Sequence, residues 1–391
     1  MIYSPLVERV AGEGAEAWIT HTEARVAQER GEDVIIMSIG DPALETPAPV
    51  LERMIEKLQA SDVRYTPAAG RMALRNALAQ AHARRTGQAV TAENVIFLSG
   101  AQNALFTASL CIAAAGDEVM ALEPLYPSYP ATIRASGATL VRVPTAAEKG
   151  FRIDVERLEA AITSRSRALF FATPNNPSGV IASEADIEAI GDLAQRHSLW
   201  VVADEVYAGL APGGRVPGLA ARLPDQVITV SSLAKSHSLP GLRAGWMVGP
   251  KQLIKHAEAL AMCMLFGLPG FIQEAAVAAL QMSDSAELRI REFCAKQRDV
   301  LLAGLADLPA IRCLAPDAGM FTLIDVRRTG LTGYEFMRAL YAAERVSVLD
   351  GGAFGLETRG FVRLCFAADD KTLREAIVRM RRFVATLRKD T

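Results

Sequence analysis

The stretch QVITVSSLAKSHSLPGLRAGWMV, residues 226–248, decides how the rest of the chain is interpreted. A strand-like run, QVITV, leads to Lys235, which lies among small and hydroxyl side chains, and a second apolar run begins at Gly245. A lysine just past a strand end can form an imine with a carbonyl group when desolvation lowers its pKa. Arg243, eight residues later, is suited to bind a phosphate bidentately. Because S-x-x-K also occurs by chance in surface turns, the interpretation depends on the other segments.

Composition places the chain among large globular proteins and excludes several function classes. Of its 391 residues, 50% are hydrophobic and 22% charged, which supports a large core in two or three domains. A net charge of −2 gives no basic surface for nucleic acid or an anionic membrane. The five cysteines and five histidines are scattered, without metal-ligand spacing, so we expect reduced thiols, no metal site and a cytoplasmic location. The uncharged stretches 94–116 and 259–272 are interrupted or too short to span a membrane.

Apolar strands alternate with helices through the middle of the sequence, which indicates an α/β fold. Nearly continuous apolar runs such as ALFFAT (168–173) and LWVVA (199–203) are typical of a mainly parallel sheet covered on both faces. After about residue 283 the pattern changes to that of a smaller α+β domain, which begins with a long helix at 286–308. We expect the other strands of the first part at 94–100, 117–122, 138–143 and 227–230, and an N-terminal strand at 32–40.

Polar residues gather at or just past the ends of these strands, where ligands bind in parallel sheets. Ser99 ends a strand, and the helix after it offers backbone N–H groups to an anion, although taken alone an ordinary serine cap is the favoured explanation. Asp204 ends LWVVAD and needs a partner, either a protonated ring nitrogen or a neighbouring loop. Asn176, in PNNPSG, either faces the sheet end or is a turn residue.

Three further residues are candidates for ligand contact, each with a simpler alternative. Tyr207 follows Asp204 by three residues and could reach the same ligand, or could be a packing tyrosine. Tyr126, in EPLYPSY, could lie flat on an aromatic ring or belong to the core. Arg363 interrupts the apolar strand GFVRLCF, so it binds either a substrate carboxylate or an internal acid.

Taken in order, PNNPSG, DEVY, SLAK and GLRAGW resemble the motifs of class I/II aminotransferases of fold type I, which depend on pyridoxal 5′-phosphate. The likeness covers nearly the whole chain and implies a large domain with a mainly parallel seven-stranded sheet, a smaller α+β domain, and a homodimer with shared active sites. It implies catalytic roles for Lys235, Asp204 and Tyr207, and substrate contacts for Gly40, Asn176 and Arg363. The implied cofactor contacts are Gly100, Ala101, Gln102, Tyr126, Asn176, Asp204, Tyr207, Ser232, Lys235 and Arg243, with Tyr65 from a partner subunit.

The chain departs from the family pattern at Ala234, where a serine is commoner, and at Tyr126, where some relatives have Trp or Phe. Within the family it is most similar to arginine–pyruvate aminotransferases, in RVAGEGAEAW, CMLFGLPGFIQEAA and MFTLIDVRRTGL. That similarity implies a basic amino donor and pyruvate as acceptor. Glu13 and Glu16 are possible partners of the cationic side chain, although solvated helix charges are the simpler interpretation.

The resemblance also predicts three segments: an N-terminal segment, 1–45, packing with the small domain, a large cofactor-binding domain, 46–285, and a small C-terminal domain, 286–391. Other functions compete with transamination. A C–S β-lyase would use the same residues, because both reactions pass through a carbanion at the substrate Cα. An aspartate or aromatic aminotransferase is a second alternative. A non-catalytic cofactor-binding regulator would need a DNA-binding domain, for which we see no room before the aminotransferase pattern begins.

Overall fold

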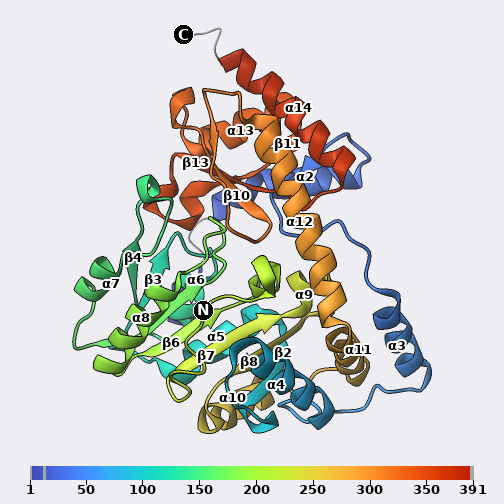
Figure 1. The fold of residues 1–391 in the computed structure, drawn as a ribbon, viewed down its shortest axis with the longest axis vertical. Helices are drawn as coiled ribbons and strands as arrows, with labels where there is room; N and C mark the ends of the chain where they lie inside the picture. The colour runs from blue at the N-terminus through green and yellow to red at the C-terminus, as the bar shows by residue number, and fades with distance from the viewer. Residues whose placement is uncertain (1, 12–14, 388–391) are drawn as a thin grey trace.

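A computed structural model describes residues 2–11 and 15–387 (Figure 1). Its centre is a seven-stranded sheet with strand order β2-β8-β7-β6-β5-β3-β4. Only β8 runs antiparallel to its neighbours, so the prediction of a mainly parallel sheet is confirmed. The strands are β2 (Val95–Ser99), β3 (Glu118–Glu123), β4 (Thr139–Pro144), β5 (Ser166–Ala172), β6 (Trp200–Asp204), β7 (Val227–Ser232) and β8 (Ala244–Val248).

Helices cover both faces of this sheet, which explains its nearly uninterrupted apolar strands. Successive side chains of a strand point to opposite faces, so Val202 and Val201 enter different cores. One face packs against α5 (Gly100–Ile112), α6 (Tyr129–Ala135) and α10 (Lys251–Met264). The other face packs against α4 (Met72–Thr86), α7 (Val155–Ala160), α8 (Glu184–Arg196) and α11 (Gly270–Gln281).

A second, smaller sheet lies beyond the long helix α12 (Ser283–Leu305), which runs from the first sheet towards it (Figure 1). This antiparallel sheet has strand order β12-β13-β10-β9. A separate apolar core joins it to α12, α13 and α14. The elements are β9 (Arg312–Cys313), β10 (Phe321–Asp325), α13 (Gly333–Glu344), β12 (Leu349–Asp350), β13 (Phe361–Cys365) and α14 (Asp370–Leu387).

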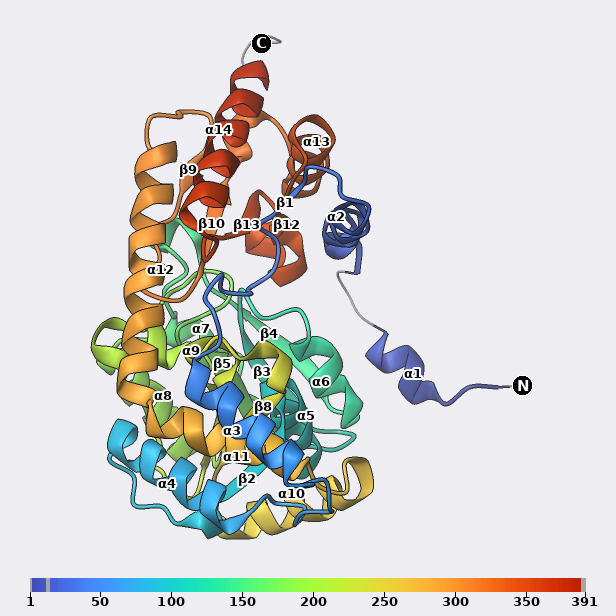
Figure 2. The same ribbon diagram turned by 90° about the vertical axis from the view of Figure 1, so that its right-hand side faces the viewer.

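The N-terminal segment contacts both parts of the molecule. Its strand β1 (Ile35–Ile36) pairs in parallel with β11 (Val346–Ser347), and α2 (Ile19–Glu29) lies beside α13 (Figure 2). The strand expected over 32–40 is therefore mostly wrong, because its partner β11 offers only two residues to pair with. The helix α3 (Ala48–Gln59) packs against α11 instead. The division into segments 1–45, 46–285 and 286–391 stays a prediction.

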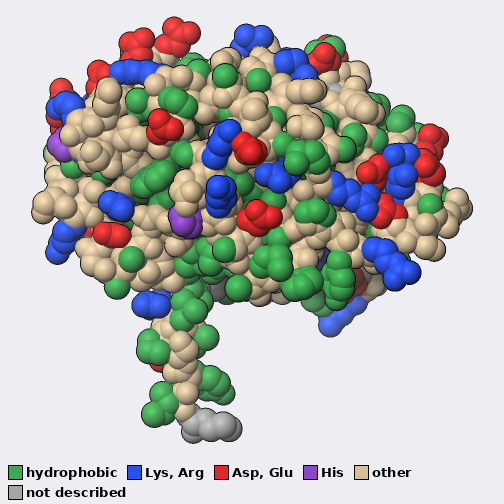
Figure 3. All heavy atoms as spheres, turned by 90° about the horizontal axis from the view of Figure 1, so that it is seen from below, with side chains coloured by type: hydrophobic (Ala, Val, Ile, Leu, Met, Phe, Trp, Pro, Cys, Tyr) green, Lys and Arg blue, Asp and Glu red, His purple; other side chains and the backbone are tan. Residues whose placement is uncertain are grey.

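The chain start forms an arm that projects from the body and carries hydrophobic side chains (Figures 2 and 3). It contains α1 (Pro5–Val10), which contacts α6, and its exposed apolar residues include Ile2, Tyr3 and Val7. None of the helices in the described part of the chain combines the length and the apolar character that a membrane crossing requires.

Candidate active site

A cavity of about 280 Å³ lies beyond the carboxyl ends of β5, β6 and β7, beside the start of α5. Segments from the whole length of the chain meet there, including Phe321 and Arg363 of the small sheet. The sequence-predicted residues that line it are Gly40, Gly100, Ala101, Gln102, Tyr126, Asn176, Asp204, Tyr207, Ser232, Lys235, Arg243 and Arg363.

Lys235 lies in the short helix α9 (Leu233–Ser236), directly after β7. The strand delivers it to the sheet end, and its Nζ donates a hydrogen bond to the carbonyl oxygen of Gly40. Burial lowers the pKa of the Lys235 amine below its ordinary value, while Asp41 and Cys365 oppose that shift. The group is thereby closer to an amine with a free lone pair, the form that attacks carbonyl carbons and accepts protons.

Asp204 is the last residue of β6 and is 6% exposed. The Tyr129 hydroxyl donates to its Oδ2 at 2.8 Å, and the Val206 N–H donates to its Oδ1 at 3.3 Å. Burial raises the pKa of the Asp204 carboxyl to about 6, although both hydrogen bonds lower it. The ionised carboxylate at this position would be stabilised by a cationic group bound in the cavity.

Arg243 closes one end of the cavity against two glycines. Its backbone is left-handed, with φ 54°, and its Nη1 donates to the Pro240 carbonyl oxygen at 3.0 Å. A Cβ on Gly100, which has φ +80°, would collide with the Arg243 guanidinium. A Cβ on Gly245 would collide with the backbone of Gly100 and Ala101. The two glycines therefore allow the Arg243 guanidinium to lie next to the N-terminus of α5. This combination favours the binding of an anion.

Arg363 is 1% exposed and has no acidic partner among the described residues. Its Nη1 donates to Asn176 Oδ1 at 3.0 Å, and its Nη2 donates to the Ser38 carbonyl oxygen at 2.5 Å. Its Nε is buried without a hydrogen bond, and its guanidinium lies 4.1 Å from the Phe321 ring centre. A buried cation held only by neutral groups is prepared for an anionic ligand.

The remaining predicted residues complete the walls, with one exception. Asn176 Nδ2 donates to the Tyr207 hydroxyl at 3.4 Å, and burial raises the pKa of that hydroxyl well above its ordinary value. Gln102 Nε2 donates to Thr132 Oγ1 at 2.8 Å, which fixes the Gln102 side chain at the start of α5. Tyr65, by contrast, is 87% exposed and does not line the cavity.

Of the two residues predicted to bind a cationic side chain, Glu16 can be placed in the structure. Glu16 is exposed in the 3-10 helix η1 (Ala15–Trp18) and does not line the cavity, and Glu13 lies outside the described residues. Sequence reasoning missed Trp18 and Asp41, which do line the cavity, and Tyr129, which orients Asp204. Asp41 directly follows Gly40, a predicted substrate contact, and this position in the sequence could have marked it as a candidate.

Comparison with known proteins identifies the family of this chain. Residues 32–380 match the family described as aminotransferase class I and II. The chain belongs to the class I and II aminotransferases. It is 43% identical to the arginine–pyruvate transaminase AruH of Pseudomonas aeruginosa over 97% of both chains. It is also 33% identical to the aspartate/prephenate aminotransferase of Thermus thermophilus, over 93% of this chain and 94% of the relative.

Solved structures confirm the fold of this aminotransferase. A Thermus thermophilus aspartate aminotransferase with maleate superposes with a TM-score of 0.92, covering 98% of this chain and 100% of that one, at 31% identity. The enzyme is thus a fold-type I aminotransferase, and its cofactor is pyridoxal 5′-phosphate. Its cavity fits that cofactor: it offers an amine, a buried acid that could pair with a ring nitrogen, and an arginine beside a helix N-terminus that could hold a phosphate.

Proposed function

We propose that this aminotransferase moves the amino group of a basic L-amino acid, arginine first among them, to a 2-oxo acid such as pyruvate. The similarity to AruH supports the substrate pair. The observation that carries the reaction is the convergence of Lys235, Asp204, Arg243 and Arg363 on one cavity.

We assign the cofactor contacts from the walls of that cavity. Arg243, Ser232 and the backbone N–H groups at the start of α5, with Gln102 beside them, would hold the phosphate. Asp204 would pair with the ring nitrogen and keep it protonated. The Asn176 amide and the Tyr207 hydroxyl, already 3.4 Å apart, would hold the ring oxygen. Tyr126 would stack on the ring face.

The substrate would be held at its carboxylate while a proton moves at its Cα. Arg363, lacking an acidic partner, would bind the carboxylate together with Asn176 and the backbone of Gly40. When bound, the cofactor supplies an electron sink that makes the Cα proton acidic. Lys235, with its lowered pKa, would remove that proton and return it on the way to products.

A basic substrate needs an acceptor for its side chain, and Asp41 is the best placed. Only two carboxylates, Asp204 and Asp41, line the described cavity, and Asp41 is exposed at its opening. We expect Asp41→Asn to raise the KM for arginine about tenfold, the value of one charge-assisted hydrogen bond. The KM for alanine should be unchanged, and equal effects on both donors would exclude this role.

We further infer that the enzyme acts in the cytoplasm as a homodimer. The five free cysteines suit a reducing compartment. The Tyr65 ring is exposed, with its centre 5.1 Å from that of Phe266, and would contact the cofactor phosphate in a partner's cavity. Tyr65→Phe should then weaken cofactor binding in the dimer, which size-exclusion chromatography with light scattering would define.

A half-reaction screen tests the proposed substrate. The purified holoenzyme is mixed with single amino acids, and the loss of cofactor absorbance is followed. We expect arginine to react with a higher kcat/KM than aspartate or phenylalanine, and faster reaction with aspartate would overturn the substrate assignment. With pyruvate present, alanine should form in proportion to arginine consumed; release of ammonia instead would identify a lyase.

A further inference from the structure

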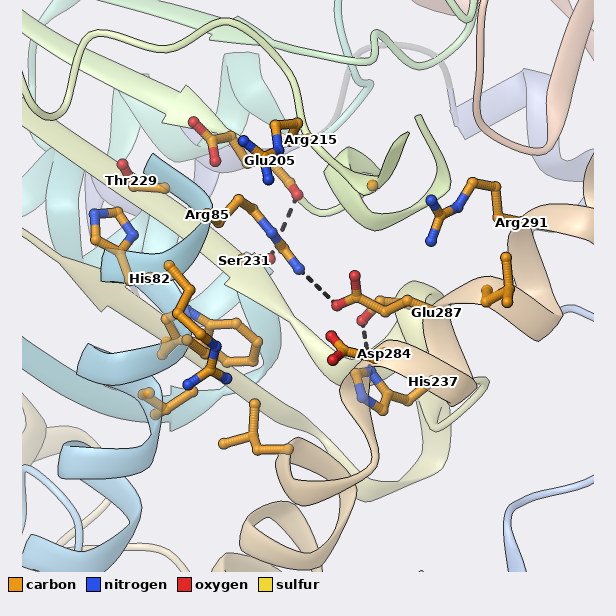
Figure 4. Close-up of a pocket in the computed structure, with 18 of the residues that line it drawn as sticks. His82, Arg85, Glu205, Arg215, Thr229, Ser231, His237, Asp284, Glu287 and Arg291 are labelled. Carbon is orange, nitrogen blue, oxygen red and sulfur yellow. Dashed lines mark hydrogen bonds and ion pairs between the residues drawn. The ribbon is translucent and has the colours of Figure 1, made fainter. Parts of the chain in front are cut away.

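A second cavity, larger than the first, lies on the opposite face of the central sheet (Figure 4). Its volume is about 580 Å³, and it is bounded by the C-terminal half of α4, the strands β7 and β8, and the beginning of α12. Alternation along β7 separates the two cavities: Ser232 faces the cofactor cavity, whereas Thr229 and Ser231 face this one.

The walls of this second cavity are strongly charged. Four arginines line it, at positions 84, 85, 215 and 291, with three acids at positions 205, 284 and 287. Arg85 and Glu287 form an ion pair at 2.6 Å, which removes one charge of each sign. The two lining histidines, His82 and His237, have pKa values lowered by burial, and that of His237 falls to about 4. At neutral pH they add no charge.

Three of the four guanidinium groups in this cavity, those of Arg84, Arg215 and Arg291, have no partner among the residues that the structure describes. Neither Arg215 nor Arg291 makes a hydrogen bond or an ion pair with any residue that the structure describes, and Arg291 Nε is buried without a hydrogen bond. Figure 4 shows the Arg291 side chain pointing into the cavity from α12, facing Arg85 across the open space. Unpartnered guanidinium groups that line the same cavity favour an oxyanion as its ligand.

Glu205 lines the cavity but supplies little negative charge to balance these arginines. It follows Asp204, is 4% exposed, and its carboxylate accepts no hydrogen bond from the described residues. Burial raises the pKa of this carboxyl to about 7, although Arg85 opposes the shift, so much of it is protonated at neutral pH. Asp284, which is exposed at the rim, is then the main acid left to balance Arg84, Arg215 and Arg291.

We propose that this cavity is a second ligand site, separate from the cofactor cavity, and that it binds a small phosphate- or carboxylate-bearing anion between Arg215 and Arg291. The excess of unpaired guanidinium groups sets the sign of the ligand charge. The Glu205 carboxyl, where it is protonated, adds a neutral donor to the lining. Nothing in this site depends on which amino acid the enzyme transaminates.

Equilibrium binding to the holoenzyme tests this site. Inorganic phosphate and, in a parallel arm, citrate are titrated calorimetrically into cofactor-saturated protein, so that the cofactor phosphate already occupies its own site. We expect one ion per chain, and at least a tenfold weaker Kd in the Arg215→Gln/Arg291→Gln double variant. Arg289→Gln, an exposed arginine on the same helix α12, is the matched control and should bind as the wild type does.

Each result of these titrations either supports or contradicts the proposed site. The ion that binds more tightly identifies the headgroup, phosphate or carboxylate. Absence of saturable binding of both ions to the wild type would overturn the proposal, as would an unchanged Kd in the double variant. If the double variant does not fold, Arg215→Gln alone serves, because Arg215 is exposed and its loss leaves the core intact; its Kd must still rise several-fold.

Discussion

The hydrogen bond from Tyr129 to Asp204 gives the sharpest quantitative prediction. Tyr129→Phe removes one hydroxyl donor, 2.8 Å from Oδ2, and leaves the ring in its core position. A hydrogen bond to a charged acceptor contributes about 1.5–3 kcal/mol, which corresponds to roughly 1–2 pKa units. The pKa of the Asp204 carboxyl, about 6 in the native protein, should therefore rise to roughly 7–8 in the variant.

Cofactor affinity reports that change, because Asp204 must be ionised to pair with a protonated ring nitrogen. The ratio of Kd values, variant to wild type, cancels the titrations that both proteins share. From these pKa values the ratio should be roughly 8–80 at about pH 5.5, fall to about 2–10 at neutral pH, and approach one at about pH 9.

The assay is a titration of cofactor-free protein with pyridoxal 5′-phosphate, followed by absorbance over that pH range. Tyr341→Phe, which changes a buried tyrosine of α13 far from the cavity, is the matched control and should give a ratio of one throughout. A ratio for Tyr129→Phe that is independent of pH would refute the reasoning, because it would show that the hydroxyl does not stabilise the ionised carboxylate.

Three further variants test separate parts of the account. Gly100→Ala places a Cβ against the Arg243 guanidinium at φ +80°, so we expect at least tenfold weaker cofactor binding, measured by absorbance titration; wild-type affinity would contradict the packing. Arg363→Lys loses the fork held by Asn176, and the KM for the amino donor should rise about 10–100-fold with a smaller fall in kcat; an effect on kcat alone would be inconsistent. Glu205→Gln concerns stability. The pKa of Glu205 is about 7 in the folded protein, above the ordinary value of 4.5, so the folded wild type binds more protons than the unfolded chain. Its free energy of unfolding therefore falls by up to about 3 kcal/mol as the pH rises from about 4.5 to above 7. The variant has no carboxyl that titrates in this range, so the Tm of the variant minus that of the wild type should increase from about pH 5 to about pH 8. A constant difference would contradict the burial argument.

Much of the fold could be predicted from local sequence, because its strands are long, apolar and buried on both faces. ALFFAT and LWVVA lie within or next to β5 and β6 and occur as expected, to within about two residues. Short elements were missed, because a helix of six or seven residues such as α6 or α7 shows too little periodicity.

The site could be predicted where a motif carried it, and not where tertiary packing did. Asn176, Asp204, Lys235 and Arg243 lie at strand ends or in turns with recognisable patterns, and the fold brings them together. Tyr129 was missed with its helix, although it belongs to the same EPLYPSY run as Tyr126. The second cavity had no local signal, because α4, the segment between β6 and β7, and α12 contribute its arginines and acids from separate parts of the chain.

The central claim is that the Lys235 amine carries the pyridoxal 5′-phosphate aldehyde in a covalent linkage. Borohydride reduction of the holoenzyme, followed by digestion and mass spectrometry, tests it directly. The account predicts a single pyridoxyl mass on the peptide that contains Lys235, with loss of the visible absorbance. A protein that takes up cofactor yet carries the tag on another lysine, or on none, would contradict it.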